Sequence, residues 1–152
     1  MYGYHRDKQN RPIFVYNLRR QIDSGLDDDT MLDVIDFFGG YNQHNALVPG
    51  KVETWNMILD VKDVGLTEFP VYALISSNTR MKQAYKVRLH NLIVVNVDWR
   101  IKLACKFIYN FLSNRIAEKI LVFADNGKDH LIKLAGADHL EKKYGGNLPN
   151  LT

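Results

Sequence analysis

The stretch NLIVVNVDWRIKLACKFIYNFLSNRIAEKI, residues 91–120, decides the fold class. It opens with the apolar run 92–97, which is too uniformly apolar for a half-exposed strand. Such a run is typical of a strand covered on both faces, as in parallel sheets. After a turn at Asp98 an apolar helix is predicted over 101–112. A charged turn then leads into a second apolar strand at 120–123. This order predicts an α/β fold.

The predicted helix 101–112 is apolar over most of its circumference. Its one narrow polar stripe consists of Lys102, Lys106 and Asn110, which are spaced four residues apart. A helix of this kind must be enclosed by protein or must meet lipid. About twelve residues cannot cross a bilayer, because a crossing helix needs about twenty. The pattern therefore leaves two interpretations open, an ordinary core helix and a helix that faces a lipid.

The rest of the chain alternates between strand and helix patterns. Strands are predicted at 13–18 and 52–61, and helices at 27–38, 67–84, 128–134 and 139–144, with loops at 19–25 and 41–50. The pair Gly39-Gly40 is expected to end or break its helix. In the strand 52–61, the alternation places Trp55, Met57 and Leu59 on one face. About four strands alternating with helices predict a largely parallel sheet in a single domain, residues 1–152.

Composition narrows the function classes. The chain has 152 residues, of which 46% are hydrophobic and 24% are charged, and its net charge is +3. These values are ordinary for one globular domain. No basic block with interleaved aromatic residues indicates a nucleic-acid partner. The single Cys105 excludes an internal disulfide and fits a reducing compartment. We expect a cytoplasmic protein, since no signal peptide or lipidation motif is visible.

The usual catalytic and metal-binding motifs are missing from the sequence. It contains no nucleophile elbow, phosphate-binding loop or dinucleotide fingerprint, and its five histidines lack metal-ligand spacing. Asp60 and Asp63 lie near the end of a predicted strand, where a catalytic acid could lie in an α/β enzyme. No partner constellation accompanies them. We therefore predict neither a catalytic residue nor a metal, and no cofactor other than a bound hydrophobic ligand.

Six short motifs occur in an order that is similar to one known family. They are Asp7-Lys8-Gln9-Asn10-Arg11-Pro12, Ile58-Leu59-Asp60-Val61-Lys62, Tyr85-Lys86-Val87-Arg88-Leu89, Ile93-Val94-Val95-Asn96, Glu118-Lys119-Ile120 and Tyr144-Gly145-Gly146. Together they resemble the CRAL-TRIO lipid-binding domain, the family of yeast-type phosphatidylinositol transfer proteins and of retinal- and tocopherol-binding proteins. The family's first motif is Asp-Lys-x-Gly-Arg-Pro, and its second ends in Asp-hydrophobic-Lys/x-Gly. The small helical bundle that usually precedes this domain is not matched, so we expect a fragment or a minimal form.

The resemblance implies a mixed, largely parallel sheet with flanking helices, and an apolar gate helix at 101–112 over a lipid cavity. The lipid-binding positions that it implies are Tyr4, Phe14, Trp55, Met57, Leu59, Val87, Phe107, Ile108, Phe111 and Lys119. For phosphatidylinositol, Lys119 is kept and Val87 replaces a Glu. For phosphatidylcholine, Tyr4 is kept, whereas Phe14, Trp55 and Met57 replace three hydroxyl side chains. A buried headgroup needs polar partners, so the resemblance implies a drier cavity and weak exchange of these two phospholipids.

The predicted function is non-catalytic binding of a hydrophobic small molecule or phospholipid in a gated apolar cavity, with transfer or sensing at a transient membrane surface. The protein would then be peripheral at membranes. Two alternatives stay open. One is a lipid-responsive regulatory or membrane-targeting module of a larger signalling protein. The other is a small α/β enzyme, which would require a polar cleft with paired titratable groups.

Overall fold

The computed structural model describes residues 1–84 and 88–151, without the side chains of residues 4, 77, 78 and 80–84. One sheet holds five strands in the order β1-β2-β3-β4-β5. These strands are β1 (Tyr2–Arg6), β2 (Pro12–Asn17), β3 (Trp55–Asp60), β4 (Leu89–Val95) and β5 (Ile120–Val122). All neighbours run parallel except β1 and β2, which form an antiparallel hairpin. The expected α/β class with a largely parallel sheet is confirmed.

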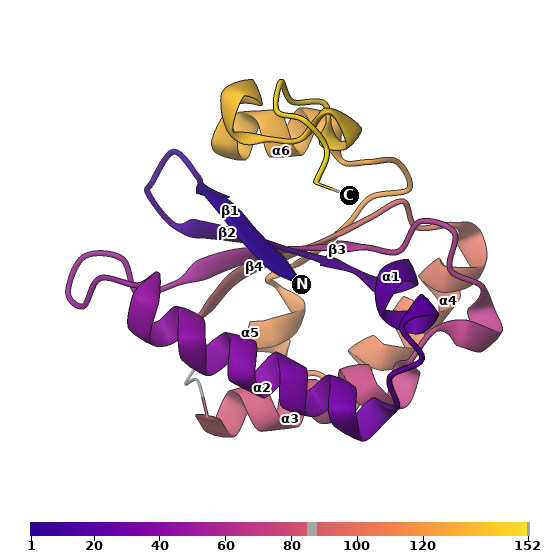
Figure 1. Cartoon of the computed structure of the whole chain (residues 1–152). Coiled ribbons are helices and arrows are strands. Elements are labelled where there is room, and N and C mark those ends of the chain that lie inside the picture. Colours follow the sequence, from indigo (N-terminus) through magenta and orange to yellow (C-terminus); the bar gives the residue numbers. More distant parts are fainter. Residues whose placement is uncertain (85–87, 152) are drawn as a thin grey trace.

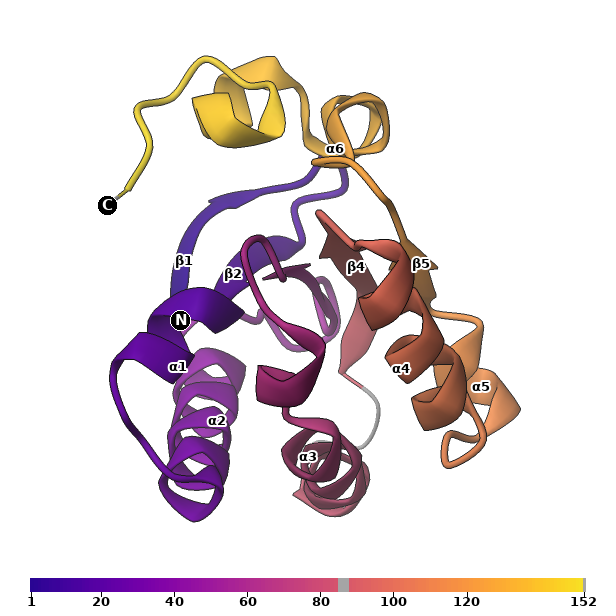
Figure 2. The same ribbon diagram turned by 90° about the vertical axis from the view of Figure 1, so that its right-hand side faces the viewer.

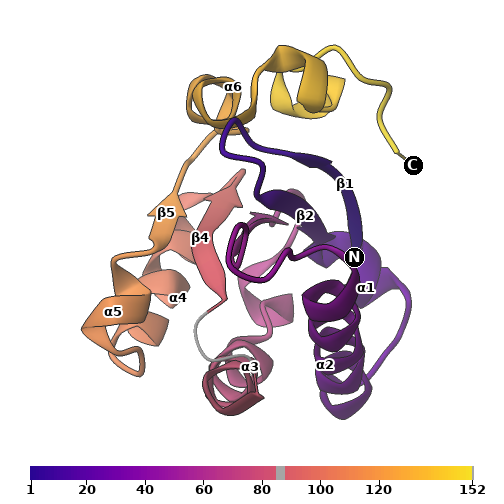
Figure 3. The same cartoon turned by 90° about the vertical axis from the view of Figure 1, so that its left-hand side faces the viewer.

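Helices cover both faces of the sheet (Figures 1 to 3). One face carries α1 (Leu18–Asp23), α2 (Asp28–Asn45), α3 (Val71–Ala84), α4 (Trp99–Tyr109) and the short α5 (Asn114–Ala117). We call it the α2–α4 face. The other is covered by α6 (Lys128–Ala135) and the 3-10 turns η2 (Ala137–His139) and η3 (Lys142–Tyr144), and we call it the α6 face. A further 3-10 turn, η1 (Leu66–Glu68), precedes α3.

Each face has its own apolar core, because successive side chains of a strand point to opposite sides. On the α6 face, Ile58 and Ile93 are fully buried against Leu131 and Leu140. On the α2–α4 face, the core contains Tyr16, Leu59 and Val94, together with residues of the covering helices. Trp55, Met57 and Leu59 share that face, as the alternation predicted. Strands with both faces covered explain the continuous apolar run of β4.

Local signals fix the starts of two helices. The carboxylate of Asp27 accepts a hydrogen bond from the Thr30 amide at 2.8 Å, and Asp98 accepts one from the Ile101 amide at 2.8 Å. Each satisfies an amide that the first helical turn leaves unpaired. The helix predicted over 101–112 therefore begins at Trp99, directly after its cap. No helix among the described residues has the length and apolarity needed to cross a membrane.

Four local predictions were wrong. Residues 2–6, where no strand was predicted because residues 4–12 have the composition of a polar turn, form β1, since pairing with β2 stabilises this segment. Residues 18–23 form α1, which the Asn17 side chain caps. Helix α2 continues through Gly39-Gly40 to Asn45, because packing of its inner face outweighs the weak helix propensity of glycine. The helix expected over 139–144 is two separate 3-10 turns.

Candidate functional site

The α2–α4 face of the sheet presents an apolar floor. The strand register aligns its side chains in two rows that cross β2 to β5, namely Phe14, Met57, Leu92, Ile120 and Tyr16, Leu59, Val94, Val122. In the first row, Phe14 is buried, whereas the three side chains on β3, β4 and β5 are only half-buried. This half of the floor therefore keeps apolar surface that the described helices do not cover completely.

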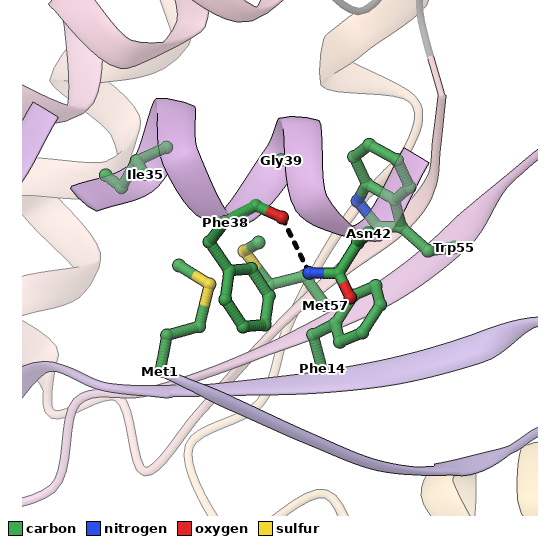
Figure 4. Close-up of a pocket in the computed structure, with 8 residues that line it drawn as sticks. All are labelled: Met1, Phe14, Ile35, Phe38, Gly39, Asn42, Trp55 and Met57. Atoms are coloured by element: carbon green, nitrogen blue, oxygen red, sulfur yellow. Dashed lines mark hydrogen bonds between the residues drawn. The ribbon is translucent and has the colours of Figure 1, made fainter. Parts of the chain in front are cut away.

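A cavity lies between this floor and α2 (Figure 4). Phe14, Trp55 and Met57 come from the floor, and Met1 closes one side. The roof is one face of α2, formed by Ile35, Phe38, Gly39 and Asn42. The Phe14 ring meets the Phe38 and Trp55 rings edge-on, with centroids 5.1 and 6.1 Å apart. The volume is about 10 Å³, roughly the room that one water molecule needs.

The α6 face is held by hydrogen bonds to buried carboxylates. Asp60, at the end of β3, accepts hydrogen bonds from the Tyr144 hydroxyl at 2.9 Å and from the Asn96 side-chain amide at 2.8 Å. Its Oδ1 also accepts the Lys62 amide at 3.1 Å. Burial, with the charge of Asp60 beside it, raises the pKa of Tyr144. Both carboxylate oxygens of Asp60 are thus engaged within the fold, so this residue holds the end of β3 in place.

A second buried carboxylate closes the β1–β2 hairpin. Asp7 accepts hydrogen bonds from the Gln9 and Arg11 amides, each at 2.9 Å, and its Oδ2 lies 2.7 Å from the Arg11 guanidinium. Asn56, on the α6 face of β3, donates to the same Oδ2 at 2.9 Å. Burial alone would raise the pKa of Asp7, but the hydrogen bonds from Arg11 and Gln9 hold this pKa below its usual value.

A third carboxylate, Glu141, fastens the C-terminal segment. It is completely buried, and it accepts a hydrogen bond from the Tyr2 hydroxyl at 2.8 Å. It also forms an ion pair with Lys143, with 3.2 Å between the charged atoms. Its other oxygen accepts the Leu151 amide at 2.5 Å. The sequence carries no signal for this residue, since a glutamate between Leu140 and Lys142 is typical of a solvated turn.

A comparison with models of known families decides to which protein family the chain belongs. The family model described as the CRAL/TRIO domain matches residues 1–146. The chain belongs to the CRAL/TRIO domain family. A crystal structure of Sfh5 has the same fold, with a TM-score of 0.63 and 17% sequence identity over 95% of this chain. The match covers 51% of the Sfh5 chain, so this chain spans about half the length of that structure.

Four of the six motifs that carry the resemblance to CRAL/TRIO domains contribute residues to the hydrogen bonds of the α6 face. Asp7, Asp60, Asn96 and Tyr144 all belong to the carboxylate hydrogen bonds described above. In the closing motif, a Cβ on Gly146 would lie 1.9 Å from the Leu140 carbonyl oxygen, so only glycine fits there. These motifs therefore identify the fold, because they hold its strand ends and its C-terminal segment in place.

At two positions where the family motifs have glycine, this CRAL/TRIO domain has Asn10 and Asp63. Their φ angles are 66° and 60°, so both residues adopt the left-handed conformation that glycine adopts easily. Asparagine and aspartate tolerate this conformation better than other side chains do. The two departures preserve the backbone path of the family. Asp63 is exposed, and it lacks the buried hydrogen bonds that hold Asp60.

Helix α4 is not enclosed by protein on all sides. Of the two interpretations that its apolar composition left open, an ordinary core helix therefore does not describe it. Ile101, Ala104 and Ile108 are buried in the core of the α2–α4 face. A row of large apolar side chains lies on the opposite side and continues past the end of the helix, and its members are between 51% and 72% exposed: Trp99, Leu103, Phe107 and Phe111. Arg100, Lys102 and Lys106 are exposed as well. This outer row and its cations form an amphipathic surface.

The predicted lipid-binding residues fall into separate groups. Phe14, Trp55 and Met57 line the described cavity, which lies beneath α2. We had expected the cavity between β3 and helix 101–112. The reason is that α4 packs into the core through its buried side, where Ile108 and Leu59 lie. Phe107 and Phe111 point outward. Val87 and the Tyr4 side chain lie outside the described residues.

Lys119 lies at the start of β5 and is half-buried. Its Nζ donates to the Leu89 carbonyl oxygen at 2.5 Å. Burial, and to a lesser extent the charge of Arg115, lowers the pKa of Lys119.

The described residues contain no group of three or more metal-binding side chains.

Two of the roof residues, Gly39 and Asn42, were missed because Gly39-Gly40 was expected to end or break the helix, whereas Ile35 and Phe38 lie in the helix predicted over 27–38 but were not assigned to a cavity. Continuing the helical pattern would have aligned Ile35, Phe38 and Asn42 on one face, at spacings of three and four residues.

Proposed function

We propose that this CRAL/TRIO domain is a non-catalytic carrier or sensor that binds a hydrophobic ligand between the apolar floor and helices α2 to α4. The observation that supports this proposal is the cavity beneath α2, where none of the described lining residues has a charged side chain. Lipid binding is a property of the CRAL/TRIO family. Burial of apolar surface contributes roughly 25 cal/mol per Å², which makes uptake of a long hydrocarbon chain favourable.

The described cavity holds far less than a lipid, so a ligand requires movement of a covering helix. The half-buried side chains of Met57, Leu92 and Ile120 continue the floor beyond the cavity, and they supply apolar surface for a ligand that enters. Hinged opening of this kind is common among proteins that close over a ligand.

Exchange is proposed to occur at a membrane, with the outer side of α4 toward the lipid. Phe107 and Phe111 would enter the acyl boundary while Lys102 and Lys106 stay at the headgroups. We expect weak exchange of phosphatidylinositol and phosphatidylcholine, because Phe14, Trp55 and Met57 offer no hydroxyl to a buried headgroup.

The test begins with native mass spectrometry of the protein from its own cells, followed by lipid extraction. We expect a hydrophobic molecule at about one per chain. Met57→Trp should fill the cavity, and this variant should no longer retain the hydrophobic molecule. Ile132→Trp, at a half-buried site on the α6 face, should still retain the molecule. The carrier proposal fails if the native protein holds no hydrophobic molecule and takes none up from vesicles. A vesicle assay that shows rapid exchange of phosphatidylinositol or phosphatidylcholine would contradict only the expected selectivity.

A further inference from the structure

Buried polar side chains are distributed unequally between the two faces. Among the described residues, the buried polar or charged side chains are Asp7, Asn42, Asn56, Asp60 and Glu141. Four of them take part in the hydrogen bonds of the α6 face. Asn42 alone lies on the other side of the sheet, in the roof of the apolar cavity. A polar group in such surroundings is costly unless it is hydrogen-bonded.

The orientation of the Asn42 amide is fixed by the helix. Its Nδ2 donates to the Phe38 carbonyl oxygen at 2.7 Å. Since a main-chain carbonyl can only accept, the NH₂ group must face the helix, and Oδ1 is turned away from it toward the Phe14 ring (Figure 4). The side chain is 6% exposed, and no described residue donates a hydrogen bond to Oδ1. Among the described residues, Oδ1 of this buried side chain therefore has no donor, and it can accept a hydrogen bond inside the cavity.

The aromatic side chains around Asn42 suit the hydrocarbon part of a ligand. Phe14, Phe38 and Trp55 form the walls, and Met57 extends the floor toward β4. In the closed form, the cavity has room for one water molecule, which can satisfy Oδ1. A ligand that displaces this water must supply a donor itself, because otherwise the hydrogen bond is lost.

We propose that Asn42 Oδ1 accepts a hydrogen bond from the hydroxyl group of a hydrophobic ligand, so that the site prefers long-chain alcohols to ligands without a donor. This inference rests on the proposed function, since it concerns the same cavity. The donor-bearing end would lie beneath α2, and the chain would run along the floor toward Leu92 and Ile120.

The experiment compares decanol with decyl methyl ether by isothermal titration calorimetry. The two probes have similar apolar chains, but only the alcohol donates a hydrogen bond. We expect the wild-type domain to bind decanol roughly three- to tenfold more tightly, which is the range of one net hydrogen bond. Asn42→Leu should abolish this preference by weakening decanol binding, with little change for the ether.

Asn45→Leu is the matched control. Asn45 makes the same contact within the helix, from its Nδ2 to the Tyr41 carbonyl at 2.7 Å, but it is exposed and does not line the cavity. This variant loses an equivalent helix hydrogen bond and should keep the preference for decanol. Asn42→Asp retains an acceptor and should keep it too.

The outcomes separate this inference from the proposed function. Equal affinities of the wild-type domain for the two probes would overturn the role of Asn42 and leave the carrier proposal standing, and this comparison does not depend on whether Asn42→Leu folds. A preference that survives in Asn42→Leu would also overturn it, because the hydroxyl would then bind elsewhere. If the wild type binds neither probe nor any extracted lipid, the proposed function fails as well.

Discussion

The two faces of the sheet are built by different means. On the α6 face, buried carboxylates of Asp7, Asp60 and Glu141 tie the hairpin, the strand ends and the C-terminal segment together. The α2–α4 face has apolar contacts, a small cavity and a floor that is half-buried from β3 to β5. Directional hydrogen bonds specify one arrangement, whereas apolar contacts can be exchanged for other apolar contacts at little cost. The α2–α4 face is therefore the face on which we propose that the domain opens.

The largest effect is expected at Asp60 on the α6 face. Asp60→Leu removes an acceptor of three hydrogen bonds and leaves Tyr144 and Asn96 without a partner for those donors. The free energy of unfolding should fall by roughly 3–5 kcal/mol, measured by urea denaturation. Asp63→Asn, at the exposed neighbouring acid, should change it by less than about 0.5 kcal/mol. Equal effects of the two substitutions would mean that Asp60 does not hold this face.

Two buried tyrosines, one on each face, give the next comparison. Tyr144→Phe takes a donor from buried Asp60 and should cost about 1–3 kcal/mol in urea unfolding. Tyr16 is buried on the α2–α4 face, its hydroxyl has no partner among the described residues, and burial raises its pKa to about 12. Tyr16→Phe should therefore be neutral or slightly stabilising. A loss as large as that of Tyr144→Phe would show that the α2–α4 face also contains a specific polar contact.

Charge reversal on α4 tests whether membranes meet the α2–α4 face. A basic residue near an anionic surface contributes about 1 kcal/mol, so Lys102→Glu with Lys106→Glu should weaken binding to anionic vesicles by roughly tenfold or more. The thermal midpoint should barely change, because both side chains are exposed.

The matched control for this prediction is Lys133→Glu with Lys142→Glu, the same change of charge at exposed sites on the α6 face. Vesicle co-sedimentation at low and moderate salt measures both pairs. If the two pairs weaken binding equally, the attraction depends on net charge alone and α4 is not the membrane-facing helix.

The smallest effect is expected from Asn10→Gly, in the hairpin that Asp7 closes. Asn10 has a φ of 66° and bonds through its main chain, with its amide donating to the Asp7 carbonyl at 2.9 Å. Asn10→Gly should raise the thermal midpoint slightly, by a few tenths of a kcal/mol in stability, since glycine adopts this φ without strain. Asn10→Val should lower the thermal midpoint, with a loss of about 1–2 kcal/mol in the free energy of unfolding. If Asn10→Val leaves the free energy of unfolding unchanged, the hairpin can change its conformation without destabilising the α6 face.

The elements that the sequence predicted best are those with strong local patterns. The apolar run at 92–97 and the alternation at 52–61 lie in β4 and β3, with boundaries shifted by a few residues. β1 was missed because it becomes a strand only by pairing with β2. The family resemblance was likewise readable, since its motifs depend on fixed residue types at the strand ends. Of the lipid-binding positions that the resemblance implied, Phe14, Trp55 and Met57 line the described cavity, and alternation within 52–61 had placed Trp55 and Met57 on one face.

By itself, the sequence determined the fold class, the family and the apolar character of helix 101–112, because periodicity and short motifs are properties of neighbouring residues. Only the tertiary structure decided that Phe107 faces outward, that Gly39-Gly40 lies within a continuous helix, and that Asn42 is buried above an aromatic floor. The physical reason is that burial depends on contacts between residues far apart in the chain. An asparagine on a helix has the same local preferences in water and in an apolar cavity, and only its neighbours across the fold distinguish the two.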